Sequence, residues 1–151
     1  MAPADIPIVP VTPRLRLLYS STISITPPLF LGETPYGERR IINITGGSFS
    51  GARLAGRILA GGADWQLLRR DGSAEVEARY TLETADGALI YLTNWGYRHG
   101  PSEVMSRLAA GDQVNPQDYY FRTTPRFETG SKKYAWLNGI IAVAVGERRA
   151  N

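Results

Sequence analysis

Apolar and polar residues alternate along several short stretches of the chain, at the two-residue period of a half-buried β-strand. Glycine, proline and Asp-Gly pairs stand between these stretches, where turns are expected. The alternation predicts strands within residues 14–25, 39–51, 118–124 and 133–147, and three more within residues 55–97. About seven or eight short strands with such punctuation indicate an all-β fold. We expect a single antiparallel β-barrel, because closure of a meander removes its exposed edges.

One helix and one irregular arm complete the predicted organisation. Residues 102–111, SEVMSRLAAG, carry apolar residues at helical spacing, with Ser102 placed to cap the first turn and Gly111 suited to a left-handed position at the end. Residues 1–13 contain four prolines, which block regular hydrogen bonding. We therefore expect an extended proline-rich arm over residues 1–13 and one β-barrel domain over residues 14–151.

The stretch EARYTLETADGALIYLTNWGY, residues 77–97, is typical of a hairpin whose turn length decides which residues share a face. A two-residue turn would leave Glu77 and Arg79 on an ordinary solvated outer face. A three-residue turn, with Gly87 in the left-handed conformation, would join these two residues to Tyr91 and its aromatic neighbours. The second register is favoured because it leaves the opposite face nearly all small or aliphatic. In that register we expect the charged, aromatic face to line a ligand-holding lumen, while the first stays open as an alternative.

Composition narrows the class of protein. The chain has 151 residues, of which 43% are hydrophobic and 21% are charged, as in an ordinary globular domain. Its formal charge is +3 and the basic residues are scattered, whereas nucleic-acid-binding proteins gather them on one face. The longest apolar run, IIAVAV at residues 140–145, is far shorter than the ~18 residues of a membrane span. The N-terminal stretch lacks the pattern of a signal peptide, so we expect a cytoplasmic protein with no nucleic-acid or membrane partner.

Residues that many metal and cofactor sites require are missing. There is no cysteine, and His99 is the sole histidine, so zinc sites and His-based triads lack their usual members. The segment GGSFSG at residues 46–51 has the glycines of a phosphate-binding loop but no following Lys-Ser or Lys-Thr pair, and we interpret it as strand bends. A dinucleotide-binding fingerprint is also missing. We therefore expect neither a metal nor a cofactor.

Four sequence blocks resemble a known family. In chain order they are GGADWQLLRRDG, ARYTLETADGALIYL, YFRTTPRFETG and KYAWLNG, and they are similar to blocks of the small barrel proteins called domain-of-unknown-function family 3237. With RLRLLY, which resembles the family's first strand, the match covers nearly the whole chain. The resemblance implies a compact β-barrel similar in shape to allene oxide cyclase, with an interior pocket and assembly into dimers or larger oligomers. It implies these pocket residues: Asp64, Trp65, Arg79, Tyr91, Arg122, Phe127, Glu128, Tyr134, Trp136 and Asn138.

These residue types could move a proton next to a carbonyl group. A carboxyl group among aromatic rings is poorly solvated, which raises its pKa toward the range useful for acid–base catalysis, and Asp64 and Glu128 are the candidates. A neighbouring Arg79 or Arg122 would favour the charged carboxylate and would also stabilise an enolate on the substrate. The expected substrate-binding side chains are Trp65, Tyr91, Phe127, Tyr134, Trp136 and Asn138, of which the last three are spaced to share one face of a strand.

The same residues also have structural interpretations. Asp64 could cap the turn before Trp65, and Arg79 could form an ion pair with Glu77 or Glu128. Tryptophan is common in protein cores because indole buries a large apolar area. The chemical interpretation therefore depends on the group of residues coming together, and on Arg79 being enclosed by the sheet.

Two functions are consistent with this set. The leading hypothesis is a cofactor-independent isomerase, cyclase or lyase that acts by acid–base chemistry on a small carbonyl-bearing, partly apolar metabolite. The alternative is a non-catalytic barrel that binds a hydrophobic small molecule. In both cases the partner is a small-molecule ligand. We also expect a homo-oligomer, with Ala142, Val143 and Val145 of the last strand in its interface.

Overall fold

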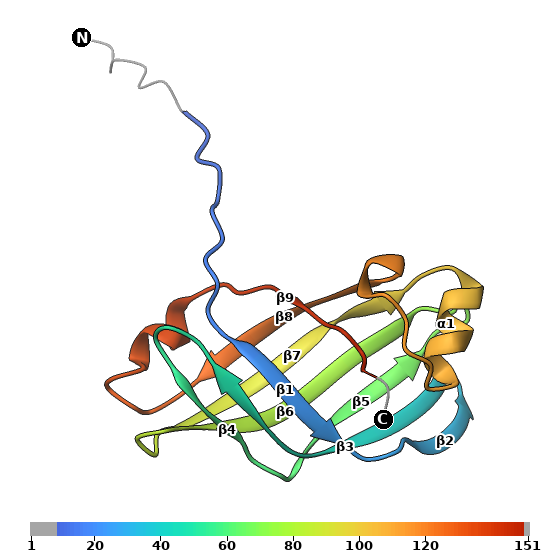
Figure 1. Cartoon of the computed structure of the whole chain (residues 1–151), viewed down its shortest axis with the longest axis horizontal. Helices are drawn as coiled ribbons and strands as arrows, with labels where there is room; N and C mark the ends of the chain where they lie inside the picture. The colour runs from blue at the N-terminus through green and yellow to red at the C-terminus, as the bar shows by residue number, and fades with distance from the viewer. Residues whose placement is uncertain (1–8, 150–151) are drawn as a thin grey trace.

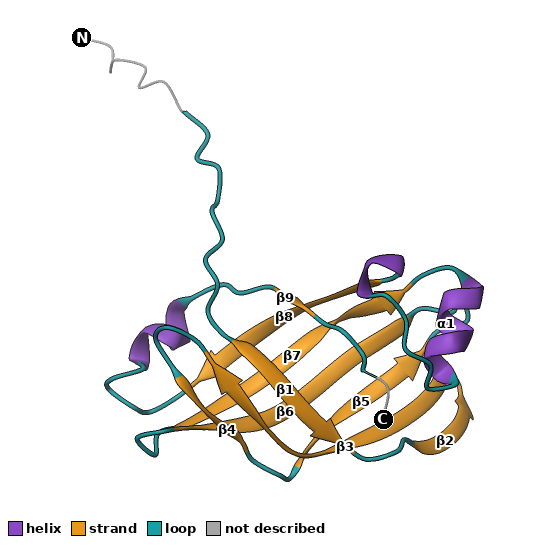
Figure 2. Cartoon of the chain, in the orientation of Figure 1, coloured by secondary structure: helices purple, strands orange, loops and turns teal. Residues whose placement is uncertain are grey.

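A computed structural model describes residues 9–149 of the chain, and strands dominate it (Figures 1 and 2). They form one sheet in the order β1-β3-β4-β6-β7-β8-β9, with β2 paired to β3, and β5 paired to β3 and β6. The described pairings are antiparallel, so the predicted all-β, barrel-like fold with one short α-helix is confirmed. The elements are β1 (Ser20–Ile25), β2 (Leu29–Thr34), β3 (Gly37–Ser50), β4 (Ala55–Ile58), β5 (Gly62–Leu68), β6 (Ala74–Thr84), β7 (Leu89–His99), α1 (Ser102–Ala109), the 3-10 helix η1 (Pro116–Asp118), β8 (Tyr120–Glu128), the 3-10 helix η2 (Ala135–Gly139) and β9 (Ala144–Val145).

The long strand β3 bends at a pair of glycines and thereby curls the sheet. Up to Ile44 the strand pairs with β5, and from Gly47 onward it pairs with β4. Gly46 and Gly47 have φ angles of +150° and +143°, which side chains disfavour. A Cβ atom on Gly47 would lie 2.2 Å from the carbonyl oxygen of Thr22 on β1. The glycine pair is therefore a strand bend that no larger residue fits.

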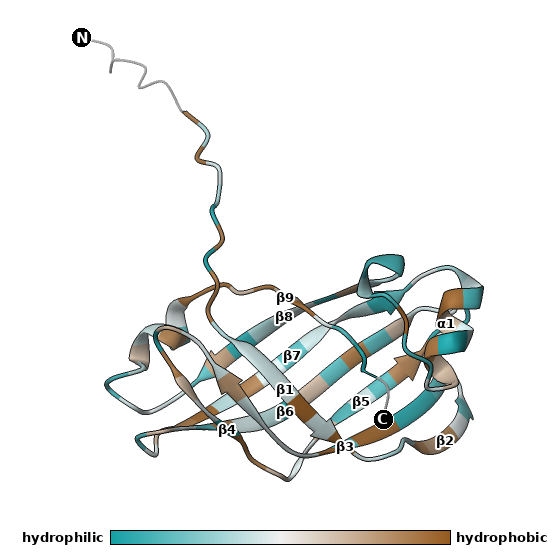
Figure 3. Cartoon of the chain, in the orientation of Figure 1, coloured by the Kyte–Doolittle hydropathy of each residue, from teal (hydrophilic) through white to brown (hydrophobic). Residues whose placement is uncertain are grey.

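The hydrophobic core lies inside the curled sheet, on one face of the β6–β7 hairpin. Leu82, Ile90 and Leu92 have no exposed surface, and each side chain of this size stabilises the fold by about 1.5–3 kcal/mol when fully buried. Phe49 of β3 and Tyr80 of β6 belong to the same buried cluster. Figure 3 shows hydrophobic and hydrophilic positions alternating along these strands, as expected when one face is inside and the other outside.

Side chains close the barrel where backbone pairing stops. Within the part of the chain that the structure describes, no ladder joins β1 to β9, the two ends of the sheet path. Leu18 and Tyr19, just before β1, and Ile140, before β9, pack on the same core cluster instead. The Tyr19 ring lies 5.4 Å from the ring of Phe49 and 6.2 Å from that of Phe127. The barrel is thus complete in its packing but has a seam in its hydrogen bonding.

The prediction of one long strand over residues 133–147 is wrong. Residues Ala135–Gly139 form the 3-10 helix η2, and only Ala144–Val145 pair, with β8. The Asn138 side chain accepts a 2.8 Å hydrogen bond from the Thr129 N–H and donates a 2.9 Å bond to the Thr129 carbonyl. Side-chain bonds of this kind compete with a strand ladder for the backbone groups.

The predicted helix is present but its start differs from expectation. Helix α1 begins at Ser102, so the N-cap position is Pro101, and no side chain caps it. Gly111, after the last turn, has a φ angle of +87°, as predicted for the helix end.

The chain forms more strands than predicted, and part of the predicted arm is described. Residues 55–97 form four strands rather than three, because β4 and β5 are separate, and β2 was not predicted. In the predicted arm, residues 9–13 are exposed and irregular, and residues 1–8 lie outside the described part of the chain. No helix among the described residues is long and apolar enough to cross a membrane.

Candidate functional site

The β6–β7 hairpin adopts the predicted register but turns the opposite face inward. Gly87 has a φ angle of +83°, and Glu77 pairs with Trp95, as in the three-residue turn. The Glu77 and Arg79 side chains are nevertheless 46% and 54% exposed, whereas Leu82, on the other face, is fully buried. Burying aliphatic side chains stabilises the fold, but burying charges is unfavourable unless they are paired. The prediction that Arg79 lies inside the barrel is therefore wrong.

Half of the predicted pocket residues lie on the outer surface of the sheet. The Arg79 guanidinium donates a 2.8 Å hydrogen bond to Glu77 and lies 5.9 Å from the ring centroid of Trp65. The Arg122 guanidinium donates to the backbone carbonyl of its neighbour Phe121. The structural interpretation of Arg79 as an ion-pair partner thus matches its contacts, and the predicted meeting of these residues in one lumen is wrong. The residues of the set that are exposed on the outer face of the sheet are Trp65, Arg79, Tyr91, Arg122 and Glu128.

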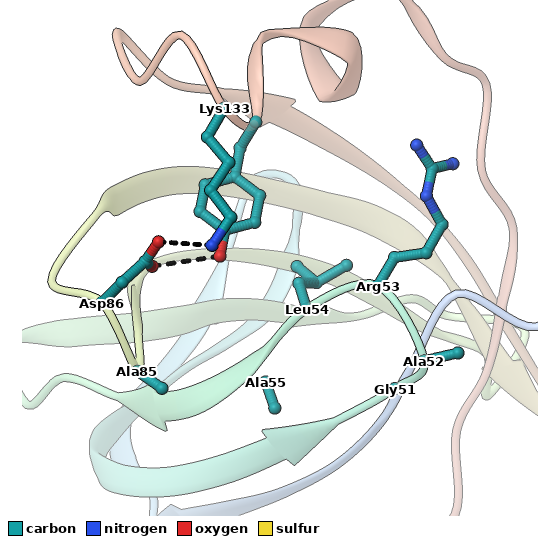
Figure 4. A pocket seen from close by; sticks show the side chains of 9 residues that line it. Gly51, Ala52, Arg53, Leu54, Ala55, Ala85, Asp86 and Lys133 are labelled. Atoms are coloured by element: carbon teal, nitrogen blue, oxygen red, sulfur yellow. Dashed lines mark hydrogen bonds and ion pairs between the residues drawn. The ribbon is translucent and has the colours of Figure 1, made fainter.

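Tyr134 lines a surface pocket at the end of the barrel that holds the β6–β7 turn. The pocket has a volume of about 270 Å³ and is open to solvent. In it Asp86 accepts hydrogen bonds from the Lys133 ammonium at 2.6 Å and from the Tyr134 hydroxyl at 3.0 Å (Figure 4). The Lys133 bond, together with one from Thr84, holds the pKa of Asp86 far below its usual range. This tightly paired carboxylate joins the turn to the loop after β8.

The remaining predicted residues are also dispersed. Phe127 is buried in the core cluster, and Trp136 carries the Arg53 guanidinium 3.6 Å from its ring centroid. Asn138 is exposed and holds the loop at Thr129. Because Tyr134, Trp136 and Asn138 lie in and before a 3-10 helix, the strand face predicted for them does not exist.

A different group of polar side chains lies on the inner face of the barrel. Asp64 of β5 and Asn94 of β7 flank Ala78 of β6, one on each side. Gln66 and Arg98 share that face, since they follow Asp64 and Asn94 by two and four residues on their strands. Gln66 is only 2% exposed and Arg98 only 8%. We refer to Asp64, Gln66, Asn94 and Arg98 as the interior polar cluster.

Asp64 is the one predicted catalytic residue in this cluster. Its Oδ1 accepts a 3.0 Å hydrogen bond from the Glu77 backbone N–H, and its Oδ2 accepts a 3.2 Å bond from the Gln66 side chain. Burial raises the pKa of the Asp64 carboxyl group, against the opposing effect of these two bonds and of the Arg98 charge. The group is held in one orientation and is easier to protonate than an ordinary aspartate.

Arg98 and Asn94 carry polar atoms without partners. The Arg98 Nη2 lies 3.5 Å from the Gln66 side-chain oxygen, and the guanidinium packs 5.5 Å from the ring centroid of Phe121. The Arg98 Nε and the Asn94 Oδ1 are buried, and neither has a hydrogen-bond partner among residues 9–149. Buried polar atoms of this kind are rare in native proteins and call for an explanation, such as a site for a ligand or water.

Small residues lie between the polar side chains of the cluster. Ala78 lies between Asp64 and Asn94, and Gly96 follows Asn94 by two residues on the inner face of β7. Ala74, opposite Arg98, is 1% exposed. These short side chains lie among longer polar ones on the inner face, and the Thr123 side chain lies beside Gly96.

Positive charge surrounds the Arg98 end of the cluster. Burial lowers the pKa of Arg98, and the nearby charges of Arg148 and Arg40 lower it further. Arg40 is itself paired with Glu38 at 2.7 Å. Within residues 9–149 no carboxylate forms an ion pair with Arg98. The cluster therefore joins an easily protonated acid to an unpaired buried cation.

This arrangement is suited to proton transfer without a metal. Asp64 could donate or accept a proton, while Arg98 and Asn94 offer hydrogen bonds to substrate oxygens. No group of three or more histidine, aspartate and glutamate side chains within the described chain could hold a metal ion. Sequence reasoning missed Gln66, Asn94 and Arg98, although each places a polar residue where the strand alternation expects an apolar one.

Comparison with known proteins identifies the family of the chain. A family model described as "Protein of unknown function (DUF3237)" matches residues 13–151. A UPF0311 protein of Bradyrhizobium diazoefficiens is 46% identical over 142 residues, which are 93% of each chain. A hydroalkoxylation enzyme of Penicillium herquei is more distant, at 26% identity over 133 residues, 88% of this chain and 74% of that one.

Solved structures agree with the fold. The crystal structure of a conserved protein of unknown function from Rhodopseudomonas palustris matches with a TM-score of 0.85 and 41% identity over 93% of both chains. A protein from Acinetobacter baumannii, described as β-barrel-like, matches with a TM-score of 0.70 and 46% identity, over 89% of this chain and 90% of that one. The match to a β-barrel-like protein supports the fold assigned here.

Proposed function

We propose that this chain, which belongs to the DUF3237 family, is a cofactor-independent enzyme that uses Asp64 to transfer protons on a small unsaturated substrate. The observation that carries the proposal is the position of Asp64. Its carboxyl group lies on the inner face of the barrel, fixed by Glu77 and Gln66, with a pKa raised by burial. Acids and bases with a pKa moved toward neutral are the most effective at proton transfer near neutral pH.

The reaction class follows from what one acid can do. In a hydroalkoxylation, a hydroxyl oxygen of the substrate bonds to one carbon of a C=C group, and a proton is added to the other carbon. Asp64 in its protonated form would give the proton to carbon, and the resulting carboxylate would take the hydroxyl proton. The step is therefore balanced: one C–O bond and one C–H bond form, one O–H bond and one π-bond break, and Asp64 ends in its starting state.

The name of the Penicillium relative supports this class, since that protein is a hydroalkoxylation enzyme and is 26% identical to the chain. When the hydroxyl and the C=C group belong to one molecule, the reaction is a cyclisation, and its reverse is an elimination. The proposal thus specifies the cyclase or lyase reaction that the sequence-based hypothesis left open. A carbonyl group conjugated to the C=C group would let Arg98 or Asn94 hold the developing enolate oxygen.

The other cluster residues orient the acid and the substrate. The Gln66 amide donates to Asp64 and lies next to Arg98, so it links the acid to the cation. The backbone N–H of Glu77 fixes the second carboxyl oxygen. A rigid acid needs less reorganisation at the moment of proton transfer, which is how preorganised groups accelerate reactions.

Deuterium exchange tests the proposal without knowledge of the natural substrate. Small hydroxy-enones and alkenyl phenols that raise the melting temperature of the protein would be incubated with it in D₂O, without any cofactor. Mass spectrometry and NMR would follow deuterium entering at carbon and formation of the cyclic ether. We expect Asp64→Asn to abolish both signals while circular dichroism shows an intact fold.

The matched control is Glu128→Gln, which removes a carboxylate at the exposed end of β8. This variant should exchange deuterium at the wild-type rate. The proposal fails if Asp64→Asn retains the wild-type rate, or if bound ligands are recovered without deuterium from the wild-type protein, as a non-catalytic binding protein would leave them.

A further inference from the structure

Arg98 presents an imbalance of charge inside the barrel. Its side chain is 8% exposed, and no carboxylate in the described chain pairs with it. The charge of Asp64 favours the charged form of Arg98, but no ion pair joins the two residues. A buried cation without a paired anion is strongly unfavourable, so such groups in proteins normally have a partner.

The neighbours of Arg98 increase the imbalance. The charges of Arg148 and Arg40 act on it with the same sign. Arg40 forms its ion pair with Glu38, at 2.7 Å, and Glu38 forms no ion pair with Arg98. The Phe121 ring beneath the guanidinium, at 5.5 Å from its centroid, offers only a weak cation–π attraction.

Two orphan atoms indicate where the missing partner binds. The Arg98 Nε–H can donate one further hydrogen bond, and the Asn94 side-chain oxygen can accept one. Both side chains rise from the inner face of β7, with Gly96 between them. A molecule that reaches both atoms would lie along this stretch of β7, beside the buried Thr123 side chain.

We propose that the interior polar cluster takes an organic acid, that is, a small, partly apolar molecule whose anionic carboxylate, enolate or phenolate oxygen pairs with the Arg98 Nε–H. Its hydrogen-bond donor faces Asn94. The inference rests on the proposed function and specifies its substrate class, because the anionic oxygen binds at one end of the cluster and Asp64 acts at the other.

Binding of a charged and a neutral isostere tests the inference. Benzoate and benzamide have nearly the same shape but differ in charge at neutral pH, and isothermal titration calorimetry would measure the affinity of the wild-type protein for each. We expect benzoate to bind at least about tenfold more tightly, a difference of about 1.4 kcal/mol. Equal affinities for the two would overturn the inference without any variant being made.

Two arginine variants locate the charge. Arg98→Met keeps the length of the side chain and removes the charge, and it should erase the preference for benzoate. Arg79→Met makes the same change on the outer face, where Arg79 is 54% exposed, and should keep the preference. If Arg98→Met retains the preference for benzoate, the anion binds elsewhere and the inference is wrong.

A third probe separates the possible anions. 4-Nitrophenol absorbs differently as phenol and phenolate, so its spectrum shows directly whether the site binds the anion. A shift toward phenolate on binding, lost in Arg98→Met, would assign phenolates or enolates to the class. Benzoate selectivity without this shift would restrict the class to carboxylates, and the absence of both would refute the proposal.

The outcome is distinguishable from a failure of the proposed function. Asp64→Asn should keep the benzoate preference, because Arg98 is untouched, while it loses deuterium exchange. If the exchange persists but benzoate is preferred, the acid–base role is wrong and the anion site stands. If exchange is lost but benzoate and benzamide bind alike, the acid–base role stands and the anion site is wrong.

Discussion

Replacing Arg98 by methionine should stabilise the protein even though it destroys ligand binding. The guanidinium is 8% exposed and has no ion-pair partner within the described residues. Its compensation comes from a long 3.5 Å contact with Gln66, from the Phe121 ring and from the charge of Asp64, which forms no ion pair with it. The cation–π attraction contributes about 1–2 kcal/mol, whereas the desolvation of a buried ion costs several kcal/mol. Methionine has a similar length and packs well against aromatic rings.

The net gain expected for Arg98→Met is about 1–3 kcal/mol, because replacing buried charges by apolar side chains of similar volume is commonly neutral or stabilising by up to about 4 kcal/mol. For a chain of this size each kcal/mol corresponds to about 2–4 °C in Tm. Urea denaturation and calorimetry of the ligand-free protein would therefore show a higher midpoint.

The control for this prediction is Arg126→Met on β8, whose side chain is exposed on the outer face. It should change the free energy of unfolding by no more than about 0.5 kcal/mol. A clear loss of stability in Arg98→Met alone would mean that the guanidinium holds the barrel together. The reasoning that Arg98 is retained for binding would then be refuted.

Four further predictions address the same structure. Burial raises the pKa of Asp64 in the folded state, so the folded protein loses stability as the pH rises from the unfolded-state pKa toward the folded-state pKa. Asp64→Asn should therefore raise Tm at neutral pH and give no gain below about pH 4. A gain in Tm that does not depend on pH would contradict this prediction. Asp86 shows the opposite behaviour, since Lys133 lowers its pKa: Asp86→Asn should lower Tm at neutral pH, and the loss should shrink as the pH falls below about 4. Gly96→Ala should destabilise the fold by about 1–3 kcal/mol in urea denaturation, because the new Cβ would lie 2.1 Å from a backbone carbonyl oxygen of β8, and wild-type stability would show that the ladder can move aside. The predicted homo-oligomer is tested by light scattering: the chain should elute as a dimer or larger, and Val145→Asp, which places a charge on a residue 71% exposed in the isolated chain, should shift it toward the monomer.

The local rules of the sequence were sufficient for the hairpin register but not for its inner face. Gly87 in a three-residue turn fixes which residues of β6 and β7 are opposite each other, and this part was confirmed. The choice of inner face depends on where the rest of the chain packs. The row that includes Leu82 is inside because its burial gives the larger gain, while Glu77 and Arg79 pair with each other in solvent.

The interior polar cluster could have been found from the sequence once this face was known. Asn94 and Arg98 follow Ile90 and Leu92 at even spacing, so they occupy positions that the alternation assigns to the core. A polar residue at a core position is more informative than one at a surface position, because its burial needs a reason. The family resemblance supplied Asp64 but not these neighbours.

The last segment shows a limit of strand prediction from composition. The stretch KYAWLNG is rich in aromatic and apolar residues, which favour strands. Asn138 nevertheless binds the backbone of Thr129 across the loop, and this contact between residues nine positions apart does not follow from the strand pattern. A side chain that satisfies two backbone groups at once outweighs the propensity of its neighbours.

At the seam between β1 and β9, the barrel wall is held by side-chain packing and not by backbone hydrogen bonds between described residues. Parting the two edges there would separate side chains around Tyr19 and Ile140 but would break no backbone ladder between described residues. Between β6, β7 and β8, by contrast, a widening of the wall would rupture several amide–carbonyl bonds together. An opening at this seam would therefore leave unbroken the ladders of β5, β6 and β7, which carry the interior polar cluster.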